Sequence, residues 1–426
     1  MNSFDCLPEH VQSALKCIVK DSGLQNYTIQ VKSGSEIGDG FAGELTSVVM
    51  EGVRDVDHGN NTKIELNLLC KLPPSNENRR REFFSDFVFG REICFYTNVL
   101  PAFIDFQREK LIPEQDRFRA YPKCYAGLNN RAEGEQVIIM EDLRRKGFQM
   151  WNKSKPTTLD NIRLVLEQIG KFHAISFAME DQRPIKFAEY KKFSDFLFKF
   201  ITTSNLRGIF DGSFERAKNS LHHNHHKEIF SKLQVNLADY VSSCLDQSVC
   251  VDFAVVSHGD LWNNNIMYRF NENNVVEDVK FVDWQMIRYV SPATDLIYHI
   301  FTATDKPLRD AEYMNLLQHY HSSLSRMIKM LGSDPDKLFT FNNLLNEMKR
   351  VGNLGLLMAP LILSISFADS SHITNIDKIC DQEANGERCH QELITGFSDE
   401  AQIEYDNRLN DIIGDLVSLR YYKELN

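Results

Sequence analysis

Residues 257–265 read SHGDLWNNN and directly follow the apolar residues 254–256, so a polar cluster begins where a short strand is expected to end. Within this cluster, Asn265 lies five positions after Asp260. A carboxylate can accept the proton of an attacking hydroxyl group, and an amide oxygen beside it can hold Mg²⁺. A single Asp in such a place is more often a turn residue, so a reactive site is predicted only if further residues support it.

Asp283 supplies the next carboxylate of the predicted site. It lies eighteen residues beyond Asn265, at the end of the strand-like run 279–282. Mg²⁺ prefers hard oxygen ligands, and some phosphate-transferring enzymes hold it with an Asn that an Asp follows further along the chain. The three side chains therefore predict a site in which Asp260 is the base and Asn265 and Asp283 bind the metal.

Residues 38–43 read GDGFAG and fit the pattern G-x-G-x-x-G, with Gly38, Gly40 and Gly43 at the glycine positions. Glycines let backbone N–H groups approach phosphate oxygens. A dinucleotide-binding fold needs a helix directly after such a loop, whereas residues 46–50 (TSVVM) favour a strand. The pattern predicts a glycine-rich flap between two strands over a nucleotide, and a dehydrogenase that binds NAD(H) is a weaker alternative.

A lysine and a glutamate follow the glycines. Residues 63–71 alternate as a strand, which places Lys71 at its end, opposite the apolar face. Apolar residues recur at helical spacing over 80–100, and Pro101 is expected to end this helix, which carries Glu92. An ammonium group at nucleotide phosphates needs a carboxylate to hold its long side chain, so we predict that Lys71 pairs with Glu92.

The chain changes character near residue 145. Before it, the sequence favours a helix at 8–20 and an antiparallel sheet, whose buried strand 136–140 leads into the charged Glu141 and Asp142. After it, the sequence is mostly helical, beginning with a helix that Thr157 is expected to cap. We predict an α+β fold with two lobes: an N-lobe over 1–144 with the sheet and a helix, and a larger α-rich C-lobe over 145–426.

Four segments carry a resemblance to a known family: 258–268 (HGDLWNNNIMY), 92–96 (EICFY), 140–143 (MEDL) and 281–285 (FVDWQ). With them the chain resembles the ecdysteroid kinase-like family of small-molecule kinases, which is related to choline and aminoglycoside kinases and has a two-lobe protein-kinase-like fold. The tryptophan and asparagines after Asp260 distinguish it from protein kinases. Because DWQ stands in place of D-F-G and no A-P-E element follows, regulation by phosphorylation of an activation loop is not expected.

The resemblance implies roles for the residues above: catalytic base for Asp260, Mg²⁺ ligands for Asn265 and Asp283, and ATP phosphate contacts for Lys71 with Glu92. It adds a hinge at Glu141 and Leu143, which would hold adenine through backbone groups. It also matches Asp295 to an acid that braces the catalytic loop.

These features predict an ATP- and Mg²⁺-dependent phosphotransferase that acts on a hydroxyl group of a small molecule. The resemblance implies an ecdysteroid or a similar steroid or lipophilic alcohol as the acceptor. A choline/ethanolamine-type kinase, a xenobiotic-glycoside kinase and a catalytically silent nucleotide-binding pseudokinase are the alternatives.

The composition excludes other classes of protein. The chain has 426 residues, of which 42% are hydrophobic and 25% charged, which excludes global disorder. Its net charge of −11 argues against a nucleic-acid partner. The start of the chain lacks a signal-like segment, the nine cysteines are scattered, and the apolar run 354–367 is short for a membrane span. We expect a cytoplasmic protein with no membrane span and no obligate protein partner.

Overall fold

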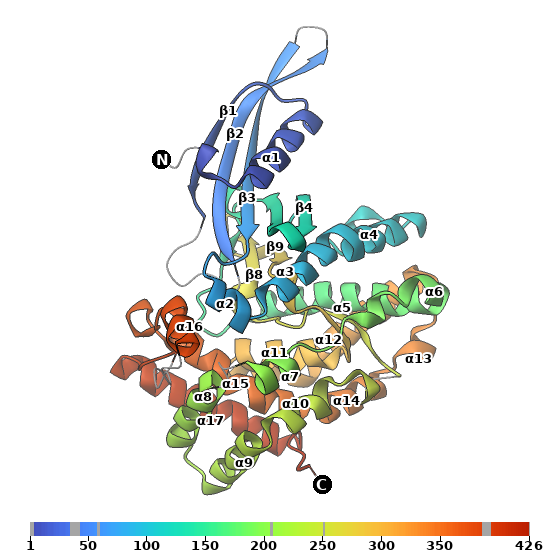
Figure 1. The fold of residues 1–426 in the computed structure, drawn as a ribbon. Helices are drawn as coiled ribbons and strands as arrows, with labels where there is room; N and C mark the ends of the chain where they lie inside the picture. The colour runs from blue at the N-terminus through green and yellow to red at the C-terminus, as the bar shows by residue number, and fades with distance from the viewer. Residues whose placement is uncertain are drawn as a thin grey trace.

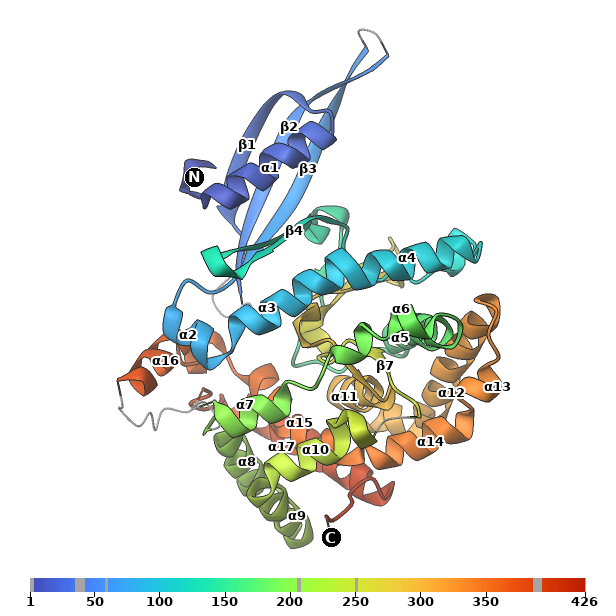
Figure 2. The ribbon, with the colours of Figure 1, turned by 45° about the vertical axis from the view of Figure 1, so that its right-hand side comes forward.

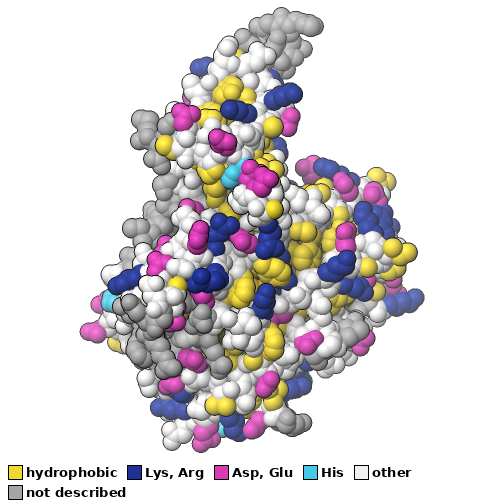
Figure 3. All heavy atoms as spheres, viewed as in Figure 1, with side chains coloured by type: hydrophobic (Ala, Val, Ile, Leu, Met, Phe, Trp, Pro, Cys, Tyr) yellow, Lys and Arg dark blue, Asp and Glu magenta, His cyan; other side chains and the backbone are white. Residues whose placement is uncertain are grey.

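A computed structural model describes residues 4–34, 43–57, 60–204, 208–249, 252–385 and 393–425. A narrow sheet lobe stands on a wide helical body, and the chain passes from the first to the second in sequence order (Figure 1). The predicted two-lobe kinase-like α+β fold is therefore confirmed. Acidic and basic side chains are interspersed over the face shown in Figure 3.

The sheet of the N-lobe has the strand order β1-β2-β3-β5-β4, and every neighbouring pair is antiparallel. Helix α1 (Glu9–Asp21) shares a hydrophobic core with one face of this sheet. Leu68 and Cys70 are fully buried in that core, while Lys71 takes the other face, as the alternation predicts. The strands are β1 (Gln25–Ser33), β2 (Glu44–Asp57), β3 (Asn60–Leu72), β4 (Cys124–Asn130) and β5 (Glu135–Glu141).

The helix predicted over 80–100 is wrong at both ends. Phe84 has a left-handed backbone (φ 49°), which separates α2 (Glu77–Glu82) from α3 (Ser85–Cys94). Pro101 does not end the helix, because a π-helical turn (Phe95–Val99) precedes it and α4 (Leu100–Glu109) continues beyond it. The π turn places Pro101 in the first turn of α4, where a helix tolerates a missing N–H donor. Figure 2 shows α3 and α4 running under the sheet.

The C-lobe is built around the long helices α5 (Leu159–Gln182) and α12 (Lys306–Met330). Thr158 caps α5 through its side chain, which accepts the N–H of Asn161, so the prediction that Thr157 is the cap is wrong by one residue. The N–H of Thr157 instead donates to the carbonyl of Ala303, at 2.8 Å. The other helices are α6 (Pro184–Phe187), α7 (Leu197–Thr203), α8 (Gly208–Ser220), α9 (Asn224–Val235), α10 (Leu237–Leu245), α11 (Ala293–Ala303), α13 (Pro335–Leu338), α14 (Phe341–Arg350), α15 (Gly352–Phe367), α16 (Ile376–Ala384) and α17 (Asp399–Ser418).

Two small sheets carry the polar clusters of the sequence. Strand β7 (Val255–Ser257) pairs with β10 (Arg288–Val290), and β8 (Ile266–Phe270) lies between β6 (Gln149–Met150) and β9 (Val276–Phe281). The predicted strands at 254–257 and 279–282 are therefore present.

A single large core joins α3 and α4 to the C-lobe. Phe95 stacks on Trp284 with ring centroids 3.9 Å apart, and Phe172 of α5 packs against both rings. The core under α1 is separate from it. Helix α15 holds the apolar run 354–367, most of which is buried, with Pro360 inside the helix. In the described ranges, no single helix is long and apolar enough to cross a membrane. The segments Pro335–Arg350 and Gly352–Phe367 meet the length and hydropathy criteria only when taken together, and they are bent by 55° relative to each other.

Candidate active site

A chain of ion pairs joins the end of β3 to α3 and to the turn after β9. The Lys71 ammonium lies 2.6 Å from Glu92 Oε2 and 2.7 Å from Asp283 Oδ1. Burial disfavours the charged lysine, but the charges of Asp283 and Glu92 outweigh it and raise the pKa of Lys71 above its ordinary value. Burial also raises the pKa of Glu92, and the positive charge of Lys71 reduces this rise. Lys71 is thus held as a fixed cation on the face of the sheet that points away from α1.

Asp283 has an unusual backbone conformation. Its φ of 64° lies in the left-handed region, which residues other than glycine rarely adopt. The residue stands between β9 and the turn Trp284–Met286, and its second carboxylate oxygen accepts a hydrogen bond from Gln285 at 3.2 Å. Such strain is common where a side chain must be aimed at a site.

Gly43 packs against the side chain of Lys71. A Cβ atom at this glycine would lie 3.1 Å from Lys71 Cε and 3.0 Å from the carbonyl oxygen of Leu72, which leaves little space for a larger residue. The other two glycines of the motif, Gly38 and Gly40, lie outside the described residues.

Asp260 and Asn265 are in direct contact. Asn265 Nδ2 donates to the carboxylate oxygen Oδ2 and to the backbone carbonyl of Asp260, each at 2.9 Å. The N–H of Val282 donates to the backbone carbonyl of Asn265 at 3.0 Å, which fixes Asn265 next to the strand that presents Asp283. Burial, followed by the negative charge of Asp283, raises the pKa of Asp260 to about 6.

Asp295, in the first turn of α11, supports the loop 258–265, which carries Asp260 and which we call the catalytic loop after its proposed role. Its carboxylate accepts the N–H groups of His258 and Gly259 at 2.8 and 2.9 Å and lies 3.2 Å from His173 Nε2. Burial opposes its charge, but these hydrogen bonds outweigh it and lower the pKa of Asp295. Gly259 has a φ of +83°, and a Cβ there would lie 2.0 Å from the carbonyl oxygen of Met286, so the turn requires glycine.

Two residues that the sequence reasoning missed also hold this loop. The Tyr298 hydroxyl donates to Asp260 Oδ1 at 2.9 Å, and Arg288 donates to the carbonyl of Gly259 at 2.5 Å while pairing with Asp195 at 2.7 Å. Tyr298 lies three residues after Asp295 on α11, so both side chains are on one face of that helix, a spacing that could have indicated Tyr298. No local signal marks Arg288, because its partners are distant in the sequence.

The predicted hinge residues lie where the sheet meets the C-lobe. Glu141 ends β5, and its side chain accepts the N–H of Lys123 at 2.7 Å and pairs with Lys146. Leu143 is buried and begins a short helical turn, Leu143–Lys146. Asp142 lies between them, and its N–H donates to the backbone carbonyl of Asn67 in β3 at 2.9 Å. Their side chains thus serve packing and ion pairs.

The residues present suit a nucleotide with Mg²⁺. Asn265 contacts Asp260 through its amide nitrogen Nδ2. Among the described residues, its amide oxygen Oδ1 accepts no hydrogen bond. This oxygen and the Asp283 carboxylate are hard donors, and Mg²⁺ is commonly bound by one or two such groups together with substrate phosphates. The structure therefore brings together Lys71, Glu92 and Asp283 in one ion-pair chain and Asp260 with Asn265 beside it, while their catalytic roles remain predictions.

Comparisons with known proteins add the family. No curated protein matches the chain. A solved GDP complex of aminoglycoside 2'-phosphotransferase-IIIa aligns over 95% of this chain and 98% of its own, at 12% identity and a TM-score of 0.39. A point variant of that enzyme, also with GDP, aligns over 89% and 94% at the same identity and TM-score. The model of the ecdysteroid kinase-like family matches residues 37–333, which is most of the chain, so this protein belongs to the ecdysteroid kinase-like family and is a small-molecule kinase.

Proposed function

We propose that the protein transfers the γ-phosphate of ATP, with Mg²⁺, to a hydroxyl group of an ecdysteroid or a similar steroid or lipophilic alcohol. The observation that carries this proposal is the contact between Asp260 and Asn265, tied through Val282 to the strand that presents Asp283. This contact supports the proposal because a carboxylate lies beside two oxygen donors of the kind that Mg²⁺ prefers.

Each residue of the site has a role in the proposed reaction. Asp260 accepts the proton of the acceptor hydroxyl, and Tyr298 and Asn265 hold the carboxylate in position for it. Asn265 and Asp283 would hold Mg²⁺, which when bound neutralises negative charge on the phosphates. Lys71 binds phosphate oxygens, and Glu92 keeps its ammonium in place.

We propose that residues 141–143 form the hinge between an N-lobe over 1–144 and a C-lobe over 145–426, with adenine held by backbone groups of Glu141 and Leu143. The large core that joins α3 and α4 to α5 also contains Ile138 and Met140 of β5, so these two helices connect the sheet to the C-lobe beside the hinge.

We place the protein in the cytoplasm. The described cysteines are all free thiols, which is typical of proteins in a reducing compartment.

The proposal is tested by incubating the protein with γ-labelled ATP, Mg²⁺ and a panel of acceptors, followed by mass spectrometry. The panel contains ecdysone, cholesterol, a phenolic glucoside, choline, ethanolamine and kanamycin. A mass gain of one phosphate group on ecdysone or cholesterol supports the proposal. Transfer to choline, ethanolamine or the glucoside favours the alternative kinases, and binding of Mg²⁺–ATP without transfer to any acceptor favours a pseudokinase.

A further inference from the structure

A small apolar cluster borders the large core, between the loop that carries Asp260, α11 and α15. Its buried members are one tryptophan, one tyrosine and two isoleucines, and two half-buried side chains of α15 flank them. We call this cluster the acceptor wall. It consists of Trp262, Tyr298, Met358, Leu361, Ile362 and Ile365.

The acceptor wall is in direct contact with Asp260. Tyr298 uses its hydroxyl to hold the Asp260 carboxylate at 2.9 Å, and its ring belongs to the wall. The N–H of Trp262 donates to the carbonyl of Asp260 at 3.1 Å. A hydroxyl group placed at Asp260 would therefore have the rest of its molecule against this apolar surface.

Part of the wall retains some exposure to solvent. Ile362 and Ile365 are 5% and 8% exposed, whereas Leu296 and Ile300 of the neighbouring α11 are 0% exposed. Met358 and Leu361 are only half-buried. Contact with a ligand would cover this remaining apolar area and so favour binding.

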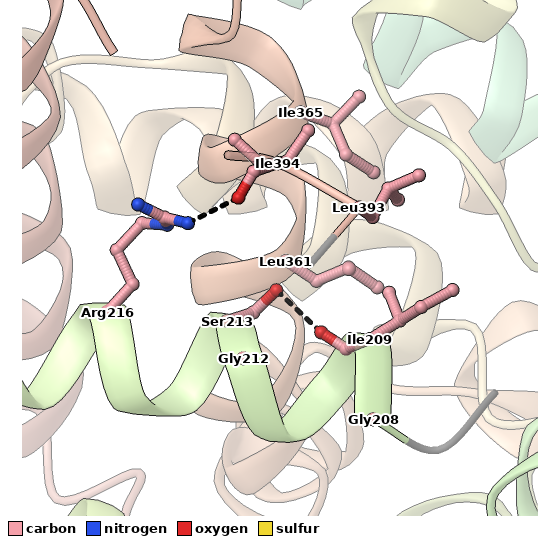
Figure 4. A pocket seen from close by; sticks show the side chains of 9 residues that line it. All are labelled: Gly208, Ile209, Gly212, Ser213, Arg216, Leu361, Ile365, Leu393 and Ile394. Atoms are coloured by element: carbon pink, nitrogen blue, oxygen red, sulfur yellow. Dashed lines mark hydrogen bonds between the residues drawn. The ribbon is translucent and has the colours of Figure 1, made fainter. Parts of the chain in front are cut away.

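The wall continues into a pocket between α8 and α15. Leu361 and Ile365 of the wall line this pocket together with Ile209 of α8, and its volume of about 10 Å³ holds about one water molecule (Figure 4). Its polar side chains are engaged within the protein: Ser213 donates to the carbonyl of Ile209 at 3.0 Å, and Arg216 to that of Ile394 at 2.6 Å. The apolar side chains of this pocket thus continue the apolar surface of the wall.

We propose that the acceptor wall binds the uncharged apolar body of the acceptor while its hydroxyl faces Asp260. This inference rests on the proposed function. None of the described residues of the wall or the pocket is acidic, so the wall itself offers no carboxylate to a cationic acceptor, only the aromatic rings of Trp262 and Tyr298.

The inference assigns acceptor specificity to a part of the chain that the family model does not cover. Four of the six wall residues belong to α15, which follows residue 333, the end of the match. Trp262 and Tyr298, which touch Asp260, lie within it. The matched region would then supply the chemistry and α15 the choice of acceptor.

The experiment measures KM and kcat for ecdysone, cholesterol, choline and kanamycin in the wild type and in Ile362→Ala and Ile365→Ala. Each variant removes about three methyl or methylene groups from the wall, so KM for the apolar acceptor should rise about tenfold while KM for ATP stays within twofold. Leu357→Ala is the matched control, because Leu357 lies on the same helix in the large core; it should lower the melting temperature without raising that KM.

If either isoleucine variant fails to fold, Leu361→Ala replaces it, because Leu361 is half-buried and its truncation disturbs the fold less. The inference is overturned if the wild type phosphorylates only choline or kanamycin, if it binds Mg²⁺–ATP but phosphorylates no uncharged alcohol, or if the wall variants keep the wild-type acceptor KM. Transfer only to choline or kanamycin, or wall variants with an unchanged acceptor KM, would reject this inference but leave a working kinase. Absence of Mg²⁺–ATP binding by the wild type would instead reject the proposed function itself.

Discussion

Replacement of Tyr298 by phenylalanine removes one hydroxyl group and tests how the base is held. In the structure, the Asp260 carboxylate accepts one hydrogen bond at each oxygen: from Tyr298 at Oδ1 and from Asn265 at Oδ2, both at 2.9 Å. Without the tyrosine hydroxyl, the carboxylate keeps only the contact at Oδ2 and can rotate away from the acceptor.

The size of the effect follows from the strength of that bond. A hydrogen bond to a charged group contributes about 1.5–3 kcal/mol, and each 1.36 kcal/mol changes a rate about tenfold. The full loss would lower kcat by about 10- to 150-fold. Because Tyr298 does not contact the residues proposed to bind the phosphates, we expect KM for ATP to stay within about twofold of wild type.

Steady-state kinetics of Tyr298→Phe with ATP and the acceptor measure both quantities. Tyr313→Phe is the control: it removes another buried hydroxyl, which pairs with Tyr421 at 2.7 Å, and should leave kcat unchanged. A folded Tyr298→Phe protein with kcat within twofold of wild type, or with KM for ATP raised as much as kcat is lowered, would refute the reasoning.

Three further predictions follow from the burial of charged and titratable groups. Lys71→Met should weaken Mg²⁺–ATP binding at least about tenfold by calorimetry, and should lower the melting temperature because it leaves buried Glu92 without its cation. Burial lowers the pKa of His258 to about 4, so between about pH 6.5 and pH 4 the unfolded chain binds a proton here that the native state does not. Because the raised pKa of Asp260 acts in the opposite direction in this range, the test compares urea denaturation of wild type and His258→Asn, and the stability of wild type relative to the variant should fall by about 3 kcal/mol over the range. A thiol reagent should modify exposed Cys17 in the native protein, whereas Cys70, whose pKa burial raises to about 12, should react only in urea.

The N-lobe sheet and the order of the site residues could be predicted from the sequence because both depend on local patterns. Alternation alone put Leu68 and Cys70 on one face of their strand and Lys71 on the other, and the structure adds that α1 covers the first face. The segments around Asp260 and Asp283 each follow a short apolar strand, and both strands are present.

The errors have physical causes that local patterns do not contain. Pro101 is a helix breaker by propensity, but the π-helical turn before it shifts the hydrogen bonds and lets the helix continue. Thr157 and Thr158 are equally good caps by type, and the contact of Thr157 with Ala303 decides between them. The contribution of α15 to the acceptor wall depends on tertiary packing, which places it beside a loop about 100 residues earlier in the chain.

The central claim, that Asp260 is the base of a phosphate-transferring site, is tested most directly by Asp260→Asn. On one preparation, Mg²⁺–ATP affinity and the single-turnover rate of phosphate transfer to the acceptor would be measured. We predict a dissociation constant close to that of wild type and a transfer rate lower by a factor of about 10²–10⁴, the usual contribution of a positioned base. Transfer at close to the wild-type rate would contradict the account.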